Sequence, residues 1–309
     1  MPRRPIKNTP ETLRKELIAL LTDFESKLQL SDLRDKVLAL IPAFHKLRDL
    51  GSSLMLRKSA SAARDRILAY FLKYPFTIIH SDELMIITGI QDYPRRLREL
   101  RREMGWNIAS GVTINEMNGE ESLSLGIDLT HIRPEEYILL DKQQDRDAAH
   151  RWYLANEIRK RKIGSKEKIL AFFQVNVGKP ITGEELRYVA GGASEWARRV
   201  RELRTEEGWS ITTKTTGRPD LAIGVYVLEQ DRQTPPHDRK IPDSVRCTVL
   251  IRDKYRCQNC GWSHEQWNLS DPRYLELHHI EAHAEGGENT TDNLKTLCNI
   301  CHDNEHRKE

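Results

Sequence analysis

Apolar residues recur with helical spacing in the first part of the chain. Thr9-Pro10 has the form of an N-cap followed by proline at the first helical position, and Ser31 or Asp32 can cap a second helix that Gly51 is expected to end. This predicts an amphipathic hairpin over residues 1–58, whose apolar stripe packs either on its own chain or on a second copy. The repeating positions are Leu13, Leu17, Leu20, Leu21, Phe24 and Leu28, then Leu33, Val37, Leu40, Ile41, Phe44 and Leu47.

The middle of the chain contains an internal repeat. Each segment of the first copy returns 102 or 103 residues later, so a single inserted residue accounts for the change of spacing. We therefore expect two copies of one domain, at residues 59–142 and 165–231. The matching pairs are Ile67–Phe71 with Ile169–Phe173, Asp82–Leu84 with Glu184–Leu186, Arg95–Arg101 with Arg198–Arg204, and Gly105-Trp106 with Gly208-Trp209.

Each copy has the pattern helix, turn, helix, turn, a third helix that carries an arginine cluster, and then a two-stranded segment. This order resembles the winged-helix domains of bacterial restriction-type proteins, mainly through the arginine run and the Gly-Trp pair. The resemblance implies a short second wing with residues 214–218 at its tip. It implies a longer first wing that runs through Gly119 towards Tyr137–Leu140.

The third helix of each copy is the expected DNA reader. In helix-turn-helix proteins the first residues of this helix enter the major groove, where arginine reads guanine and glutamine reads adenine. Alternatively the arginines form a solvated face paired with Glu99 or Glu202, and the aromatic residues pack in the core or contact a methylated base. The candidate DNA contacts are Gln91, Tyr93, Arg95, Arg96 and Arg98, then Ser194, Trp196, Arg198, Arg199, Arg201, Lys214 and Arg218.

Two segments connect these domains to their neighbours. Residues 143–164 are strongly charged, with Trp152, Tyr153, Leu154 and Ile158 as their apolar content, and are expected to form a linker helix. Residues 232–245 contain prolines and are expected to form a linker that lets the last module, residues 246–309, be placed independently.

The last module contains two Cys-x-x-Cys pairs. Four thiolates on two tight turns supply the tetrahedral ligand shell of a structural zinc ion. Two disulfides would be the competing interpretation, but they require an oxidising compartment. Cys247 is left over and is expected to be an ordinary thiol near a core. The proposed zinc ligands are Cys257, Cys260, Cys298 and Cys301.

A histidine pattern lies between the two cysteine pairs and just after them. Leu275–Ile280 alternates as a half-buried strand does, a Gly286-Gly287 loop follows, and Leu294–Leu297 predicts a return strand before a helix from Asn299. His302 and His306 are four residues apart, so they share one helix face and can bind one metal ion together with His278. His279 is expected to project from the other side of its strand.

At these residues the chain resembles the HNH, or ββα-metal, nucleases, in the branch where a four-cysteine zinc knuckle clamps the motif. The resemblance implies that His279 is the general base and that Asn293 ties the loop that orients it. It also implies that His278, His302 and His306 bind one divalent ion, either Mg²⁺ or Mn²⁺, or else Ni²⁺ or Zn²⁺. His264 and His283 are interpreted as core residues.

Composition limits the class of protein only broadly. A chain of 309 residues has room for two or three domains, and 49 Lys plus Arg against 46 Asp plus Glu do not by themselves indicate a polyanionic partner. Charged residues make up 31% of the chain, and we identify neither a targeting signal nor a membrane-spanning run. We therefore expect a cytoplasmic, bacterial-type protein.

The combined prediction is a multidomain protein, mainly α with α+β: a helical hairpin, two winged-helix domains and a C-terminal ββα-metal HNH domain. It is expected to act as a restriction-type endonuclease on double-stranded DNA, as a homodimer because one such module cuts one strand. Within this class the readers could instead require a modified base, and N6-methyladenine is the first candidate. A zinc-knuckle transcriptional regulator without catalysis and a mobile-element or homing-type nuclease also fit the sequence.

Overall fold

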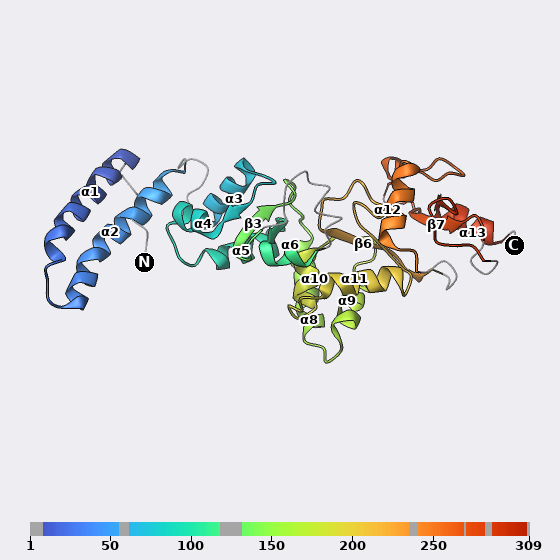
Figure 1. Cartoon of the computed structure of the whole chain (residues 1–309), viewed down its shortest axis with the longest axis horizontal. Helices are drawn as coiled ribbons and strands as arrows, with labels where there is room; N and C mark the ends of the chain where they lie inside the picture. The colour runs from blue at the N-terminus through green and yellow to red at the C-terminus, as the bar shows by residue number, and fades with distance from the viewer. Residues whose placement is uncertain are drawn as a thin grey trace. The chain divides into compact units, whose positions relative to one another are not determined.

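The computed structural model describes residues 9–55, 62–117, 132–234, 240–268, 270–281 and 286–307. The chain forms two compact units, the first made of Met1–Ile108 and Glu135–Ala148, the second of Ala109–Pro134 and Ala149–Glu309. Helices predominate within the described ranges, and the strands pair into small sheets of two or three strands (Figure 1).

The N-terminal hairpin consists of α1 (Pro10–Lys27) and α2 (Leu33–Ser53), which lie side by side (Figure 1). Both predicted caps are present: the side chain of Thr9 accepts a hydrogen bond from the Thr12 amide, and that of Asp32 accepts one from the Asp35 amide. Such caps satisfy amide groups that have no partner inside the helix.

The prediction that Gly51 ends the second helix is wrong, because α2 continues to Ser53. Gly51 instead permits close contact with α4 (Ser81–Thr88). A Cβ atom added at Gly51 would lie 2.6 Å from the carbonyl oxygen of Ile86, and Arg48 donates a hydrogen bond to the Gly89 carbonyl at 2.7 Å. The absence of a side chain at Gly51 therefore lets α2 and α4 pack closely, whereas the sequence suggested that this glycine ends the helix.

The two repeats have the same order of elements. Each has a helix, a two-residue strand, two further helices and two more strands, and the sheet orders β1-β3-β2 and β4-β6-β5 are equivalent. The first repeat contains α3 (Ala63–Lys73), β1 (Ile79–His80), α4, α5 (Tyr93–Arg102), β2 (Ile108–Ser110) and β3 (Glu136–Leu139). The second contains α9 (Ser165–Gln174), β4 (Ile181–Thr182), α10 (Gly183–Val189), α11 (Trp196–Thr205), β5 (Trp209–Thr212) and β6 (Val225–Gln233).

A short helix that the sequence did not predict, α6 (Gly111–Glu116), follows β2 and belongs to the second unit. Glu184 of α10 accepts hydrogen bonds from the Ser110 amide at 2.7 Å and the Thr113 hydroxyl at 2.8 Å. Glu116 of α6 in turn accepts from Arg187 and from the Trp196 indole. This segment therefore packs against the second repeat. The expected course of the first wing through Gly119 lies outside the described residues.

The segment between the repeats contains α8 (Ala148–Arg159), which packs on the second repeat. The Arg151 guanidinium lies 2.9 Å from the Glu185 carboxylate, and both side chains are almost completely buried. The Trp152 and Tyr188 rings meet edge to face, with centroids 5.2 Å apart.

The last module is not placed independently of the second repeat. Arg204 of α11 forms a buried ion pair with Asp243, the first residue of α12 (Asp243–Arg252). The Tyr255 hydroxyl donates to the Thr215 carbonyl at 3.3 Å, and Arg232 of β6 lies 3.3 Å from Asp303. The proline-containing segment therefore joins two domains that make direct contact. Independent placement was expected because a polar segment with prolines is typical of a free linker. Its sequence does not show which surfaces of the two flanking domains meet.

A hydropathy search of the helices among the described residues finds none with the length and apolar character that crossing a bilayer requires.

The buried Arg151–Glu185 pair provides a stability test. Replacing Arg151 with alanine leaves the Glu185 carboxylate buried without its partner, so we expect thermal or denaturant unfolding to show a loss of about 3–5 kcal/mol. Lys160→Ala is the matched control, because the Lys160–Glu157 pair is exposed and contributes little. Equal stability of the two variants would contradict this account.

Candidate metal centre and active site

The last module is a strand hairpin followed by a helix. β7 (Leu275–His279) pairs antiparallel with β8 (Leu294–Cys298), and α13 (Asn299–His306) follows directly. The register places Leu275 opposite Cys298 and His279 opposite Leu294. Alternation along β7 directs Leu275 and Leu277 into the hydrophobic core, which also contains Trp262 and Leu297, while Glu276 and His278 lie on the opposite face.

The four cysteines of the two Cys-x-x-Cys pairs converge. Their sulfur atoms all lie within 4.8 Å of one another, and the Cys260 and Cys298 sulfurs are 3.8 Å apart. A tetrahedral zinc ion with Zn–S bonds of about 2.3 Å would separate its sulfur ligands by about 3.8 Å, so the cluster fits a structural zinc. The Cys260 and Cys301 amides point at the sulfurs of Cys257 and Cys298, each at 3.5 Å.

The thiols of this cluster do not ionise alike. Burial raises the pKa of Cys298 and of Cys301. Burial also opposes ionisation of Cys257, but amide donors outweigh it and lower the pKa of that thiol to about 7. Holding all four as thiolates therefore requires a cation among them, which a zinc ion supplies.

The three candidate histidine ligands also meet. His278 of β7 and His302 and His306 of α13 have ring nitrogens within 4.8 Å of one another. The Nε2 atoms of His302 and His306 are 3.2 Å apart, and the three rings are edge to face with centroids 4.6–5.2 Å apart. Three imidazoles on one side leave further coordination positions for water or substrate, as an open catalytic metal site requires.

Glu276 supports this group from behind, a role that the sequence analysis missed. Its carboxylate lies 2.9 Å from Nδ1 of His302, and both side chains are buried. A carboxylate at Nδ1 would orient the ring and raise the basicity of Nε2 if His302 bound a metal ion. The available signal was weak: an acidic residue two positions before His278 in an otherwise apolar strand.

His279 lies on the other side of the strand from His278, as predicted. Its Nε2 is 2.8 Å from the side-chain oxygen of Asn289, a partner that the sequence analysis also missed. Asn289 donates weakly to the Lys240 carbonyl at 3.4 Å, which is consistent with this orientation of its amide. In the tautomer that carries its proton on Nε2, His279 donates to this oxygen, and Nδ1 is then the atom that can accept a proton.

Asn293 ties the loop between the two strands together. Its side-chain oxygen accepts from the Glu281 amide at 2.9 Å, and its side-chain nitrogen donates to the carbonyls of Glu281 and Glu288 at 3.1 Å each. Gly287 fits between these groups, since an added Cβ would lie 2.0 Å from the Glu281 carbonyl oxygen. This glycine is therefore required by the close approach of the two ends of the loop.

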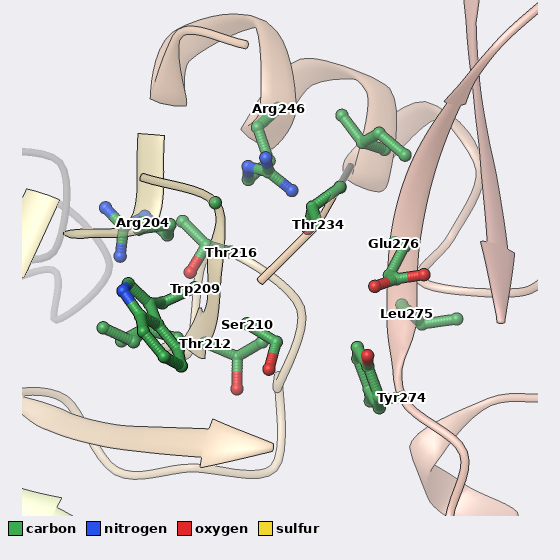
Figure 2. Close-up of a pocket in the computed structure, with 13 residues that line it drawn as sticks. Arg204, Trp209, Ser210, Thr212, Thr216, Thr234, Arg246, Tyr274, Leu275 and Glu276 are labelled. Carbon is green, nitrogen blue, oxygen red and sulfur yellow. The ribbon is translucent and has the colours of Figure 1, made fainter. Parts of the chain in front are cut away.

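A cavity of about 40 Å³ lies on the second-repeat side of this module. Figure 2 shows Arg246 of α12, together with Tyr274 and Glu276 of the last module, facing Trp209 and Thr216 of the second repeat. Glu276 thus lines the cavity while its carboxylate contacts His302. Glu276, which contacts the histidine group, is therefore also part of the contact between the second repeat and the last module.

Two of the predicted DNA contacts are wrong. Trp196 has an exposed fraction of 0%, packs edge to face on Tyr226 and donates to Glu116, so it is a core residue. Arg218 is 7% exposed, pairs with Asp220 and Glu229, and lies over the Trp267 ring of the last module. Trp196 is explained by burial of one face of its helix, and Arg218 by its contact with the last module. Helix periodicity shows neither.

The remaining candidate DNA contacts differ in their exposure and in their ion-pair partners. Arg95 and Arg96 pair with Glu99, and Arg198 and Arg199 pair with Glu202, within their own helices. Tyr93 is half-buried against Tyr137, Arg201 is half-buried, and the Lys214 ammonium donates to the Leu221 carbonyl at 3.3 Å. The positions with the most open surroundings are Gln91, Arg95, Arg98, Ser194 and Arg198.

The last module also matches a known family. Residues 257–308 match the HNH endonuclease family. This module is an HNH endonuclease domain. The match includes all four cysteines of the zinc-type cluster and all three histidines of the HNH domain's candidate metal site.

The repeats and a curated relative extend the comparison. Residues 64–140 and 166–229, which fall within the two repeats, match the KpnI N-terminal domain family. The HNH-bearing chain is 41% identical over 59 residues to the type IV methyl-directed restriction enzyme EcoKMcrA of Escherichia coli strain K12. That alignment covers 19% of this chain and 21% of the enzyme, so the chain spans about a fifth of its curated relative. No solved structure matches the chain significantly.

The cysteine cluster of the HNH domain gives a direct test. We expect Cys260→Ser to lose the bound zinc, measured by elemental analysis, and to destabilise the HNH domain selectively in thermal unfolding. Cys247→Ser is the matched control because Cys247 lies outside the cluster, and it should keep both the metal and the stability. Zinc retained at the wild-type level in Cys260→Ser would disprove the four-thiolate site.

Proposed function

We propose that this protein is a restriction-type, site-specific DNA endonuclease that acts on double-stranded DNA as a homodimer. The observation that carries the proposal is the convergence of three histidines beside a cysteine cluster, with His279 on the opposite side of β7, inside a segment that matches HNH endonucleases. The match of both repeats to the N-terminal domain of a KpnI family and the relation to a restriction enzyme support the restriction role.

In this proposal His279 is the general base. Its Nε2 proton is held by Asn289, so Nδ1 takes a proton from the attacking water, and Asn293 fixes the loop that carries Asn289. His278, His302 and His306 would hold the divalent ion, and Glu276 would orient His302. When bound, such an ion stabilises negative charge on the scissile phosphate and the leaving oxygen.

The repeats are proposed to be winged-helix DNA readers. Three helices and a three-stranded sheet of order β4-β6-β5 are consistent with that fold, in which α11 would be the reading helix. Arg198 and Ser194 are exposed at the start of α11, and Gln91, Arg95 and Arg98 are exposed at the corresponding end of α5. The ion pairs with Glu99 and Glu202 would hold the arginines extended until a phosphate or base replaces the carboxylate.

The general base is tested by plasmid cleavage. We expect His279→Ala to lose at least about 100-fold in cleavage rate in Mg²⁺ or Mn²⁺, because the water then has no positioned base. The variant should bind DNA and metal as the wild type does, since His279 is outside both proposed sites. His150→Ala, which changes an exposed histidine of α8, is the control and should cut normally.

Undiminished metal-dependent cutting by His279→Ala would refute the assignment of the base. If the wild-type protein binds DNA tightly without nicking it in Mg²⁺, Mn²⁺ or Ni²⁺, the protein is a transcriptional regulator and the endonuclease proposal fails.

A second candidate function is cleavage directed by a modified base. The curated relative is described as methyl-directed, and its alignment with this chain covers 59 residues, which is 19% of the chain. Trp196 no longer supports a contact with a methyl group, because it is buried. The exposed positions around Gln91 and Ser194 are the ones that would have to distinguish a modified base.

Digestion of one plasmid purified from a host that methylates adenine at N6 and from a host that does not provides the test. Methyl-directed cleavage predicts fragments from the first preparation alone. Equal cleavage of both preparations would exclude dependence on that mark, and fragments from the unmethylated plasmid alone would indicate protection by it.

A further inference from the structure

The α1/α2 hairpin has an inner face where its helices meet. The less exposed positions of α1 include Leu13, Leu17, Leu20 and Phe24, and those of α2 include Ala39, Ala43, Lys46 and Leu50. Lys46 and Glu16 form an ion pair of 2.6 Å between the two helices. These positions recur every three or four residues, which defines the direction from each helix axis to its neighbour.

The residue that follows each inner position lies about 100° further around its helix. Because the helices of a hairpin run in opposite directions, the same rotation brings both rows of following residues to the same side of the hairpin. The α1 row contains Ile18 and Leu21, with Leu28 close to it, and the α2 row contains Val37, Leu40, Phe44 and Leu47. All seven side chains are between 41% and 55% exposed.

The other side of the hairpin is different. The residues that precede the inner positions are mainly polar, with Leu38 as an exception among the larger side chains. They include Thr12, Asp23, His45 and Asp49. The hairpin therefore has one apolar face and one polar face, in addition to the surface buried between its two helices.

The α2 row has the spacing of a helix–helix seam. Leu33, Val37, Leu40, Phe44 and Leu47 follow one another at intervals of four, three, four and three residues, the heptad pattern of helices that pack along their length. Gly51 continues the row and is covered by Ile86 of α4. The row is thus in contact with its own chain at one end and exposed along the rest.

The α1 row is complementary to itself. Arg14 and Glu25 are its charged members and lie at equal distances on either side of Ile18 and Leu21. When two such rows run antiparallel across a two-fold axis, Arg14 of one copy lies opposite the partner's Glu25. The exposed apolar area of the face is on the order of the ~800 Å² that each partner contributes to a stable interface.

We propose that this apolar face binds the same face of a second copy of the chain, so that two hairpins form a four-helix bundle. The bundle gives the homodimer of the proposed function a physical interface. It brings two HNH domains into one particle, which cutting both strands of a duplex requires. The interface forms without DNA or metal, so its test does not depend on cleavage.

Sedimentation of the full-length protein without DNA tests the bundle. The wild type is expected to sediment with twice the 35.9 kDa chain mass. Val37→Glu places two carboxylates in the interface and should raise the dimer dissociation constant by at least about tenfold. Leu38→Glu is the matched control: Leu38 is 48% exposed against 55% for Val37, but it lies on the polar face, so its dissociation constant should stay within about twofold.

Two results would overturn the proposal: a wild-type protein that stays monomeric as its concentration rises, or equal dissociation constants for the two glutamate variants. Circular dichroism checks that Val37→Glu keeps its helices. If it does not, Leu47→Glu is the second variant, because Leu47 is equally exposed on the same row. A Val37→Glu variant that loses the dimer but still nicks one strand of a duplex at the normal rate would show that the interface and the catalytic assignment are independent.

Discussion

The site depends on the cysteine cluster that joins the start of the HNH domain to its last strand and helix. Cys298 is the final residue of β8 and also caps α13, while Cys257 and Cys260 approach it from the turn after α12. Fixing this junction fixes the direction in which α13 leaves the hairpin. His302 and His306 then lie over His278, and a shift of this helix by one residue would rotate both rings away from it.

The support of the histidine group extends into the second repeat. Glu276 contacts His302 on one side and lines the cavity against Trp209 and Thr216 on the other, and the Arg204–Asp243 pair attaches α12 to α11. The proposed reader and the proposed catalytic group of the second unit therefore share one set of contacts. If α11 reads bases as proposed, this arrangement favours cleavage at a fixed distance from them, because described residues of the second repeat and the HNH domain are in direct contact.

The sequence predicted what short-range chemistry determines and failed where tertiary contacts decide. Cys-x-x-Cys spacing, the i, i+4 histidines, the capped helices and the repeat are local patterns, and the structure places them as expected. Gly51 and Arg218 were misinterpreted because each is explained by a residue that packs against it, Ile86 and Trp267 respectively. For Trp196 the sequence left core packing and DNA contact open, and the structure places it in the core beside Glu116. Asn289 and α6 have no periodic signal, so only the folded chain shows what they contact.

The central claim is that His278, His302 and His306 bind one divalent ion beside His279, separately from the thiolate site. Anomalous diffraction at the manganese edge, from crystals soaked in Mn²⁺, measures this directly. The account predicts a manganese peak within coordination distance of these three imidazoles and a distinct zinc site among the four sulfurs. Manganese density absent from the histidines, or bound by other side chains, would contradict it.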